Sequence, residues 1–162
     1  MKLNEGIEWA IHCCSILAAL PPDIALSAKR LAEFFDLPSH YLAKHLQSLS
    51  QAGLVSSSKG PGGGYSLAKP ADQISVLNIV QAIDGRAAHF QCTEIRQRGP
   101  SGVEPPCYKN PCGIARTMWR AEKAWRAELA AVSLADIGQL GLNEIPQTQM
   151  DKSLHWFESV IK

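Results

Sequence analysis

The stretch that decides the fold is SHYLAKHLQSLSQAGLVSSSKGPGGGYSL, residues 39–67. Its first half repeats apolar residues at helical spacing, with Leu42 and Leu46 on one face, and Ser39 is expected to cap this helix at its start. Gly53 is expected just past its end, because glycine readily adopts the left-handed conformation found there. Two short strand-like runs then flank a glycine-rich tip, which predicts a β-hairpin.

Helical patterns lie on both sides of this stretch. Before it, residues 4–20 and 30–35 have helical spacing, and Ser27 can cap the second of these helices. After it, residues 75–83 form a further short helix. A helix, a short turn, a second helix and a hairpin in this order are typical of a winged helix-turn-helix. The sequence therefore predicts a mainly α protein with a small β-wing.

The C-terminal half begins with a stretch that has no clear periodicity. Residues 86–110 are rich in glycine and proline, which predicts a loop. From Gly113 onward, Ile114, Met118 and Trp125 follow a heptad-like spacing that fits either a helix packed on a partner or a core helix of the same chain. The pattern after residue 135 is mixed. We divide the chain into a DNA-binding domain (1–85), a cysteine-containing loop (86–112) and a dimerisation helix with a C-terminal segment (113–162).

Length and composition favour an ordinary globular protein. The chain has 162 residues, of which 46% are hydrophobic and 19% charged, and its net charge is +1. No long apolar run predicts a membrane span, and the N-terminus does not resemble a signal peptide, so a cytoplasmic location is expected. Motifs of thiol oxidoreductases, serine hydrolases and phosphate-binding loops are missing from the sequence. We expect a protein that is not an enzyme.

A modest excess of basic residues covers the predicted DNA-binding unit. Between residues 28 and 69, five Lys or Arg residues stand against two acidic ones. Polar groups near the start of a recognition helix contact bases and phosphates, and glycines in a wing let the backbone approach DNA. The alternative is a solvated helix face with glycines that only form the turn. The candidate DNA-binding residues are Ser39, His40, Tyr41, Lys44, His45, Gln47, Lys59, Gly62, Gly63, Gly64 and Tyr65.

Five cysteines fall into two groups. Three of them, Cys92, Cys107 and Cys112, lie in the glycine- and proline-rich loop, where a flexible chain lets several thiolates reach one metal centre. The other two, Cys13 and Cys14, are expected to be buried in the first helix. Within that helix Glu8 and His12 are four residues apart and share one face. They can bind one metal atom or form an exposed hydrogen-bonded pair.

Three runs of this sequence resemble the signature of a known family. The runs 41–46, 52–55 and 60–65 are similar to those of the IscR/NsrR/RirA family, bacterial winged-helix transcription regulators that commonly sense through an iron–sulfur cluster. The resemblance covers about residues 1–132. It implies a homodimer joined partly through the helix 113–132, with two recognition helices on a pseudo-palindromic double-stranded DNA operator.

The N-terminal run IEWAIHCC, residues 7–14, and the insert 93–100 resemble the RsrR-type redox regulators within that family. This resemblance implies a 2Fe–2S cluster between two subunits. Its ligands would be Cys107 and Cys112 of one chain with Glu8 and His12 of the other. Cys92 is a further candidate, although fourteen residues separate it from Cys107.

Such mixed ligation predicts a redox sensor. Two thiolates, a carboxylate and a neutral imidazole carry less negative charge than four thiolates, so reduction is easier and reversible cycling is expected. We expect transcriptional repression controlled by this cycling. Trp9, beside Glu8, is either a relay to the DNA-binding unit or a packed aromatic. The alternative function is a cluster-free winged-helix regulator that uses cysteine oxidation or zinc.

Overall fold

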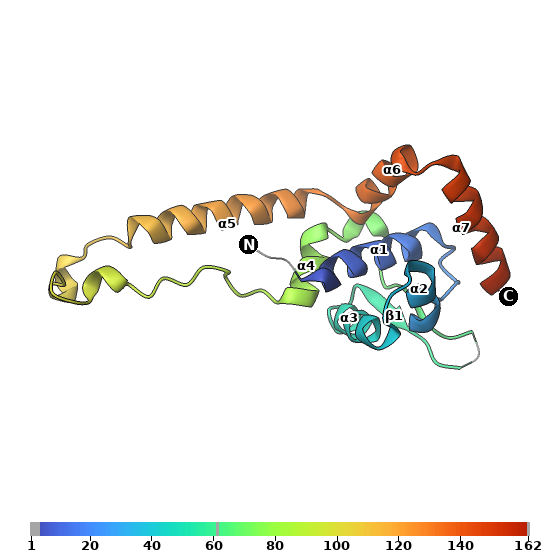
Figure 1. The fold of residues 1–162 in the computed structure, drawn as a ribbon, viewed down its shortest axis with the longest axis horizontal. Helices are drawn as coiled ribbons and strands as arrows, with labels where there is room; N and C mark the ends of the chain where they lie inside the picture. Colours follow the sequence, from blue (N-terminus) through green and yellow to red (C-terminus); the bar gives the residue numbers. More distant parts are fainter. Residues whose placement is uncertain (1–3, 61, 162) are drawn as a thin grey trace.

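The computed structural model describes residues 4–60 and 62–161 and has the expected class of fold (Figure 1). In these described residues, helices make up most of the fold and one two-stranded antiparallel sheet lies at the edge of the body. The helices are α1 (Glu5–Ala19), α2 (Ala28–Phe35), α3 (Ser39–Gln51), α4 (Val76–Asp84), α5 (Gly113–Ala131), α6 (Leu134–Glu144) and α7 (Gln147–Val160), and the strands are β1 (Val55–Ser57) and β2 (Tyr65–Leu67). Short 3₁₀ turns are η1 (Ala71–Gln73), η2 (Ile95–Gln97) and η3 (Pro105–Cys107).

The body of the molecule is built around α1, which contacts α3, α4 and α6. On the predicted apolar face of α3, Leu42, Leu46 and Leu49 have no exposed surface, whereas Tyr41 is 51% exposed. The predicted burial of Cys13 and Cys14 is confirmed, because both are completely covered. Burial raises the pKa of both thiols to about 12, and the neighbouring Cys13 also raises that of Cys14. Both thiols are therefore packing groups at neutral pH.

The helix ends follow the sequence signals with one exception. The Ser27 hydroxyl accepts from the Arg30 amide, as predicted for the start of α2. Ser39, however, is not the N-cap of α3, so that prediction was wrong. The cap is Pro38, whose carbonyl accepts from the Tyr41 amide, since proline already has the backbone angle needed to begin the helix.

The wing is the predicted hairpin, with Val55 opposite Leu67. Gly62 adopts a φ of +81°, which a side chain would strain. At Gly64 a Cβ atom would collide with the backbone of Leu26. This close approach lets Leu26 and Tyr65 exchange backbone hydrogen bonds of 2.8 and 3.0 Å, which fix the base of the wing against the body.

Residues 86–131 form an arm that projects from the body (Figure 1). The chain runs outward in an extended path, turns through η2 and η3, and returns along α5. Near the base, the Glu122 carboxylate accepts from Arg126 at 2.8 Å and from the His89 amide at 3.2 Å. Arg126 also donates to the Ala87 carbonyl at 2.9 Å. These polar contacts hold the outgoing segment against α5.

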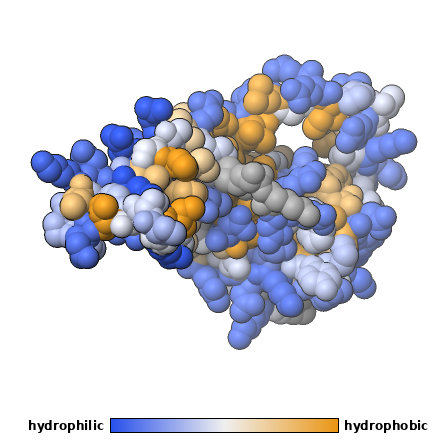
Figure 2. Space-filling view, turned by 60° about the vertical axis from the view of Figure 1, so that its left-hand side comes forward, coloured by the Kyte–Doolittle hydropathy of each residue, from blue (hydrophilic) through white to orange (hydrophobic). Residues whose placement is uncertain are grey.

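The apolar seam predicted along α5, which includes Ile114, Met118 and Trp125, lies in two different environments. At its C-terminal end Trp125 and Val132 pack with a small core that contains Ile7 and Val80. Toward its N-terminal end Ile114 is 69% exposed. Figure 2 shows apolar patches between polar groups on the projecting part of the molecule. One end of the seam is thus a core element, and the other has no cover within the described chain.

The sequence missed α6 and α7, which return to the body instead of extending the arm. Helix α6 packs on α1, and α7 packs on α2 through aromatic rings. Phe34 stacks on Phe157 with ring centroids 5.1 Å apart and meets Trp156 edge-on at 5.0 Å. The segment 113–162 therefore contributes both to the arm and to the body. Among the described residues, no helix is long and apolar enough to cross a membrane.

Candidate functional site

The exposed face of α3 carries most of the predicted DNA-binding residues. Its buried leucines fix the helix on the body, so the opposite face is held in place. The Tyr41 ring lies 4.2 Å from the His40 ring, and the Lys44 Nζ atom lies 5.5 Å from the Tyr41 ring centroid. Ser39 and Gln47 are also exposed. The result is a polar, partly aromatic surface on the second helix of a helix-turn-helix, which is the element that enters the major groove.

His45 lies on a different side of α3 from the other candidates. Its ring meets the Trp9 ring edge-on at 6.0 Å, and it fills the space where a side chain at position 6 would project. A side chain at position 6 would have to displace this ring. His45 joins the two helices, and a DNA contact by His45 stays a prediction.

The wing carries an exposed lysine and several glycines that the shape of the hairpin requires. Lys59 is exposed near the tip. A Cβ at Gly63 would collide with the Ser58 carbonyl, as one at Gly64 would with Leu26. Tyr65 is half-buried and belongs to the base of the wing. The glycines thus shape the hairpin, and their contact with DNA stays a prediction.

Glu8 and His12 lie on the exposed side of α1. They line a surface hollow of about 390 Å³, together with Asn4, Glu5, Ile7 and Ile11. No hydrogen bond joins Glu8 to His12 in the described structure. The His12 ring instead lies 5.5 Å from the Phe35 ring at the end of α2. Both polar groups are therefore open to a ligand from outside the chain.

The three loop cysteines lie along the arm, away from α1. Cys107 is exposed, whereas Cys92 and Cys112 are half-buried. Cys112 immediately precedes α5, where the amides of Ala115 and Ile114 lower the pKa of its thiol. Since α5 has 19 residues, its axis spans about 28 Å, so Cys112 is held far from the body end of the arm.

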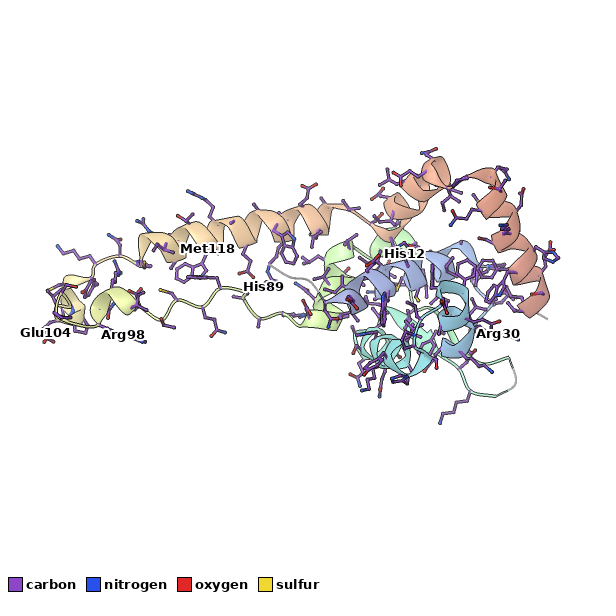
Figure 3. All side chains as sticks on the ribbon, in the orientation of Figure 1. His12, Arg30, His89, Arg98, Glu104 and Met118 are labelled. Atoms are coloured by element: carbon purple, nitrogen blue, oxygen red, sulfur yellow. The ribbon has the colours of Figure 1, made fainter. Side chains whose placement is uncertain are left out.

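The two halves of the predicted ligand set are not brought together within one chain. In Figure 3 the outer part of the arm, marked by Arg98 and Glu104, lies at the far left of the view, well away from the α1 region, where His12 is labelled. Among the described residues, no three His, Cys, Asp or Glu side chains are close enough to hold a metal ion. Each half would need a second chain to complete it.

The sequence missed a pair of charged residues within the insert. The Glu94 carboxylate accepts from the Arg96 Nε at 2.8 Å. This contact is the main reason that the pKa of Glu94 is lowered, and the Cys112 amide and the Cys92 thiol add to the effect. Opposite charges two residues apart were visible in the sequence, but nothing there showed that they lie beside the cysteines.

Comparison with known proteins identifies the family of this chain. A model of the Rrf2 family, described as an iron-dependent transcriptional regulator, matches residues 3–139. The chain belongs to the Rrf2 family. Proteins of similar sequence include YffB of Lactococcus lactis, assigned as an HTH-type transcriptional regulator, which is 34% identical over 85% of this chain and 86% of its own. The protein rrf2 of Nitratidesulfovibrio vulgaris is 32% identical over 85% of this chain and 87% of its own.

Solved structures of Rrf2-type regulators show the same fold. CymR of B. subtilis, the global cysteine regulator, superposes with a TM-score of 0.65 at 24% identity and covers 86% of this chain and 98% of its own. IscR of T. potens has a TM-score of 0.63 at 23% identity and covers 92% of this chain and 91% of its own. This Rrf2 member is accordingly a DNA-binding transcriptional regulator, and its relatives are regulators and not enzymes.

Proposed function

We propose that this regulator is a cytoplasmic repressor that responds to redox state through a 2Fe–2S cluster shared by two subunits. Cys107 and Cys112 of one subunit and Glu8 and His12 of the other would hold it. The observation that carries the proposal is the separation of these two pairs within one chain. Each pair is accessible, and neither is a complete metal site alone.

The residues fit such a group chemically. Thiolates, carboxylate and imidazole are all known ligands of protein-bound iron. Cys112 lies where backbone amides favour its thiolate, and Glu8 and His12 line an open hollow. A bound 2Fe–2S cluster would supply the ability to accept and release one electron. Cys92 is placed behind these ligands, because fourteen residues separate it from Cys107.

Dimerisation would bring the two pairs together. The exposed apolar residues at the outer end of α5, Ile114, Met118 and Trp119, provide an uncovered face on the same arm that carries the cysteines. A closed homodimer buries the same patch on both subunits, so two arms would pack together and each would reach the other body. The matched pair of recognition helices would then bind a pseudo-palindromic operator.

Helix α1 provides the physical connection from ligands to DNA. Its Trp9 contacts His45 of the recognition helix, and its His12 contacts Phe35 of α2. A change in charge at the Glu8 and His12 face therefore acts next to both helices of the DNA-binding unit. Trp9 is partly buried against the core, as a packed aromatic would be, and its role as a relay is part of this proposal.

The test is purification without oxygen, followed by visible spectroscopy, iron and sulfide counts, and a redox titration. We expect a coloured protein with one reversible step and different operator affinities in the two states, because a switch requires differential affinity. A titration without a reversible step, or equal affinity in both states, would contradict the proposal. A Trp9→Ala variant with normal redox dependence would remove Trp9 from the relay.

A cluster-free regulator is the second candidate, favoured by the lowered pKa of Cys112. A thiolate at the start of a helix is the form that reacts with oxidants. In this case the oxygen-protected protein would be colourless and without iron. Its operator affinity would change on treatment with hydrogen peroxide and recover with a dithiol reductant. Zinc bound by the same cysteines would be found by metal analysis.

A further inference from the structure

One guanidinium group ties together the two turns of the cysteine loop. The Arg96 Nε donates to Glu94 at 2.8 Å, and its other end donates to the Asn110 carbonyl at 2.6 Å. The same guanidinium lies 4.8 Å from the Tyr108 ring centroid. Arg96 therefore joins the turn at residues 94–97 to the segment at 108–110.

Tyr108 completes the connection. Its hydroxyl donates to the Arg96 carbonyl at 3.0 Å and accepts from the Val103 amide at 3.2 Å. Tyr108 and Asn110 both lie between Cys107 and Cys112 in the sequence. Holding these two residues therefore limits how far the two thiols can move relative to each other.

Little else orders this part of the chain. Ile95 and Val103 are 72% and 54% exposed, and Cys107 is exposed as well. A loop without a buried apolar core depends on its polar contacts, and it opens easily when they are lost. The contacts made by Arg96 and Tyr108 are thus the ones that join the two parts of the cysteine-bearing segment.

The ion pair between Glu94 and Arg96 also sets the charge beside the thiols. Glu94 lies close to the Cys112 amide and the Cys92 thiol, and Arg96 balances its negative charge. Removal of Arg96 would leave a carboxylate there, which disfavours an added electron. Removal of Glu94 would leave a guanidinium, which favours one. The two changes should act on a nearby redox group with opposite sign.

We infer that Arg96, paired with Glu94, is a positioning residue that clamps the loop in the form in which Cys107 and Cys112 receive the cluster, and that the pair tunes the ease of its reduction. The tuning rests on the proposed function. The clamp itself is a property of the chain without any cluster.

The clamp is tested by hydrogen–deuterium exchange of residues 103–112 in the cluster-free, full-length protein. Arg96→Gln is expected to speed exchange roughly two- to fivefold, the range for loss of an exposed ion pair. Arg98→Gln is the matched control, since the Arg98 side chain donates to the nearby Thr93 carbonyl at 3.0 Å and its loss should leave this exchange unchanged. Unchanged exchange in Arg96→Gln would overturn the clamp.

The tuning is tested by the reduction potential of the cluster-loaded variants. Arg96→Gln should lower the potential and Glu94→Gln should raise it, whereas Arg96→Lys should keep the wild-type potential yet lose the exchange protection, because lysine keeps the charge without the planar fork. Shifts of the same sign, or none, would overturn the tuning. If the wild-type protein contains no iron, the proposed function is refuted. The exchange experiment on the cluster-free protein still tests the clamp in that case.

Discussion

The body and the arm are held in shape by different means. In the body, side chains such as Leu31, Leu42 and Ile79 are fully covered and pack around α1. In α5, the long helix of the arm, Ala115 is the buried residue and Trp125 packs on a small core at the C-terminal end, whereas the Glu122–Arg126 ion pair and backbone contacts hold the outgoing segment. The body is therefore shaped by contacts within its own chain, whereas the arm leaves apolar side chains uncovered.

The largest effect is expected from a cavity in the body. Leu46→Ala should reduce the free energy of unfolding by about 2–5 kcal/mol, because Leu46 is fully buried in α3. The matched change in the arm, Ile95→Ala, should alter it by no more than about 0.5 kcal/mol, because Ile95 is 72% exposed and lies outside the proposed dimer face. Urea unfolding at one fixed protein concentration measures both. Equal losses in the two variants would contradict the contrast between body and arm.

High pH should weaken the body through its two buried thiols. Native Cys13 and Cys14 keep their protons up to a pKa of about 12, whereas the unfolded thiols ionise near their ordinary value of 9.0. Above about pH 9 the unfolded state therefore binds fewer protons than the native one, and stability falls by about 1.4 kcal/mol per pH unit for each thiol.

Unfolding experiments at pH values from 8 to about 10.5 check this slope. Cys14→Ala should make it shallower, whereas Cys107→Ala in the arm should leave it unchanged. A slope that is identical in all three proteins would show that the buried thiols do not govern it.

A charge on the exposed seam of the arm should weaken the homodimer. Ile114→Glu is expected to raise the dimer dissociation constant about tenfold or more, equivalent to about 1.4 kcal/mol, because a carboxylate would be buried in an apolar contact. Ala127→Glu, on the opposite side of α5, is the control. Sedimentation equilibrium measures both, and a dimer that tolerates Ile114→Glu would exclude this face as the contact.

The smallest effect concerns the surface that the body presents to DNA. Lys44→Ala should reduce operator affinity by about 1 kcal/mol and reduce the slope of log affinity against log salt by about 0.9, the contribution of one phosphate contact. Lys152→Ala, on α7, should change neither. Fluorescence anisotropy at several salt concentrations gives both quantities, and an unchanged slope would place Lys44 away from phosphate.

The sequence predicted the winged helix-turn-helix well because its signals are local. Helical periodicity, the Ser27 cap, Gly53 and the hairpin glycines each act within a few residues. Ser39 failed as a cap because Pro38 competed for the same position. The helices α6 and α7 were missed although Ser133 and Asp136 form a capping box, since their mixed polarity hides which face packs on the body.

The candidate site was less accessible to sequence reasoning, because its parts depend on contacts between distant segments. The polar pattern of α3 placed His45 with the other DNA-binding candidates. In the structure its ring instead packs against Trp9 of α1, in the space left by the missing side chain at Gly6. The role of Arg96 was also hidden, because its contact with Asn110 spans fourteen residues of irregular chain.

The burial of Cys13 and Cys14 has a practical consequence for spectroscopy. Both thiols are covered and protonated at neutral pH, so a maleimide or methanethiosulfonate reagent reaches only the arm cysteines. With Cys92 and Cys112 replaced by serine, one spin label at Cys107 would report the separation of the two arm tips in an assembled pair by pulsed electron resonance, with the interior left in its native state.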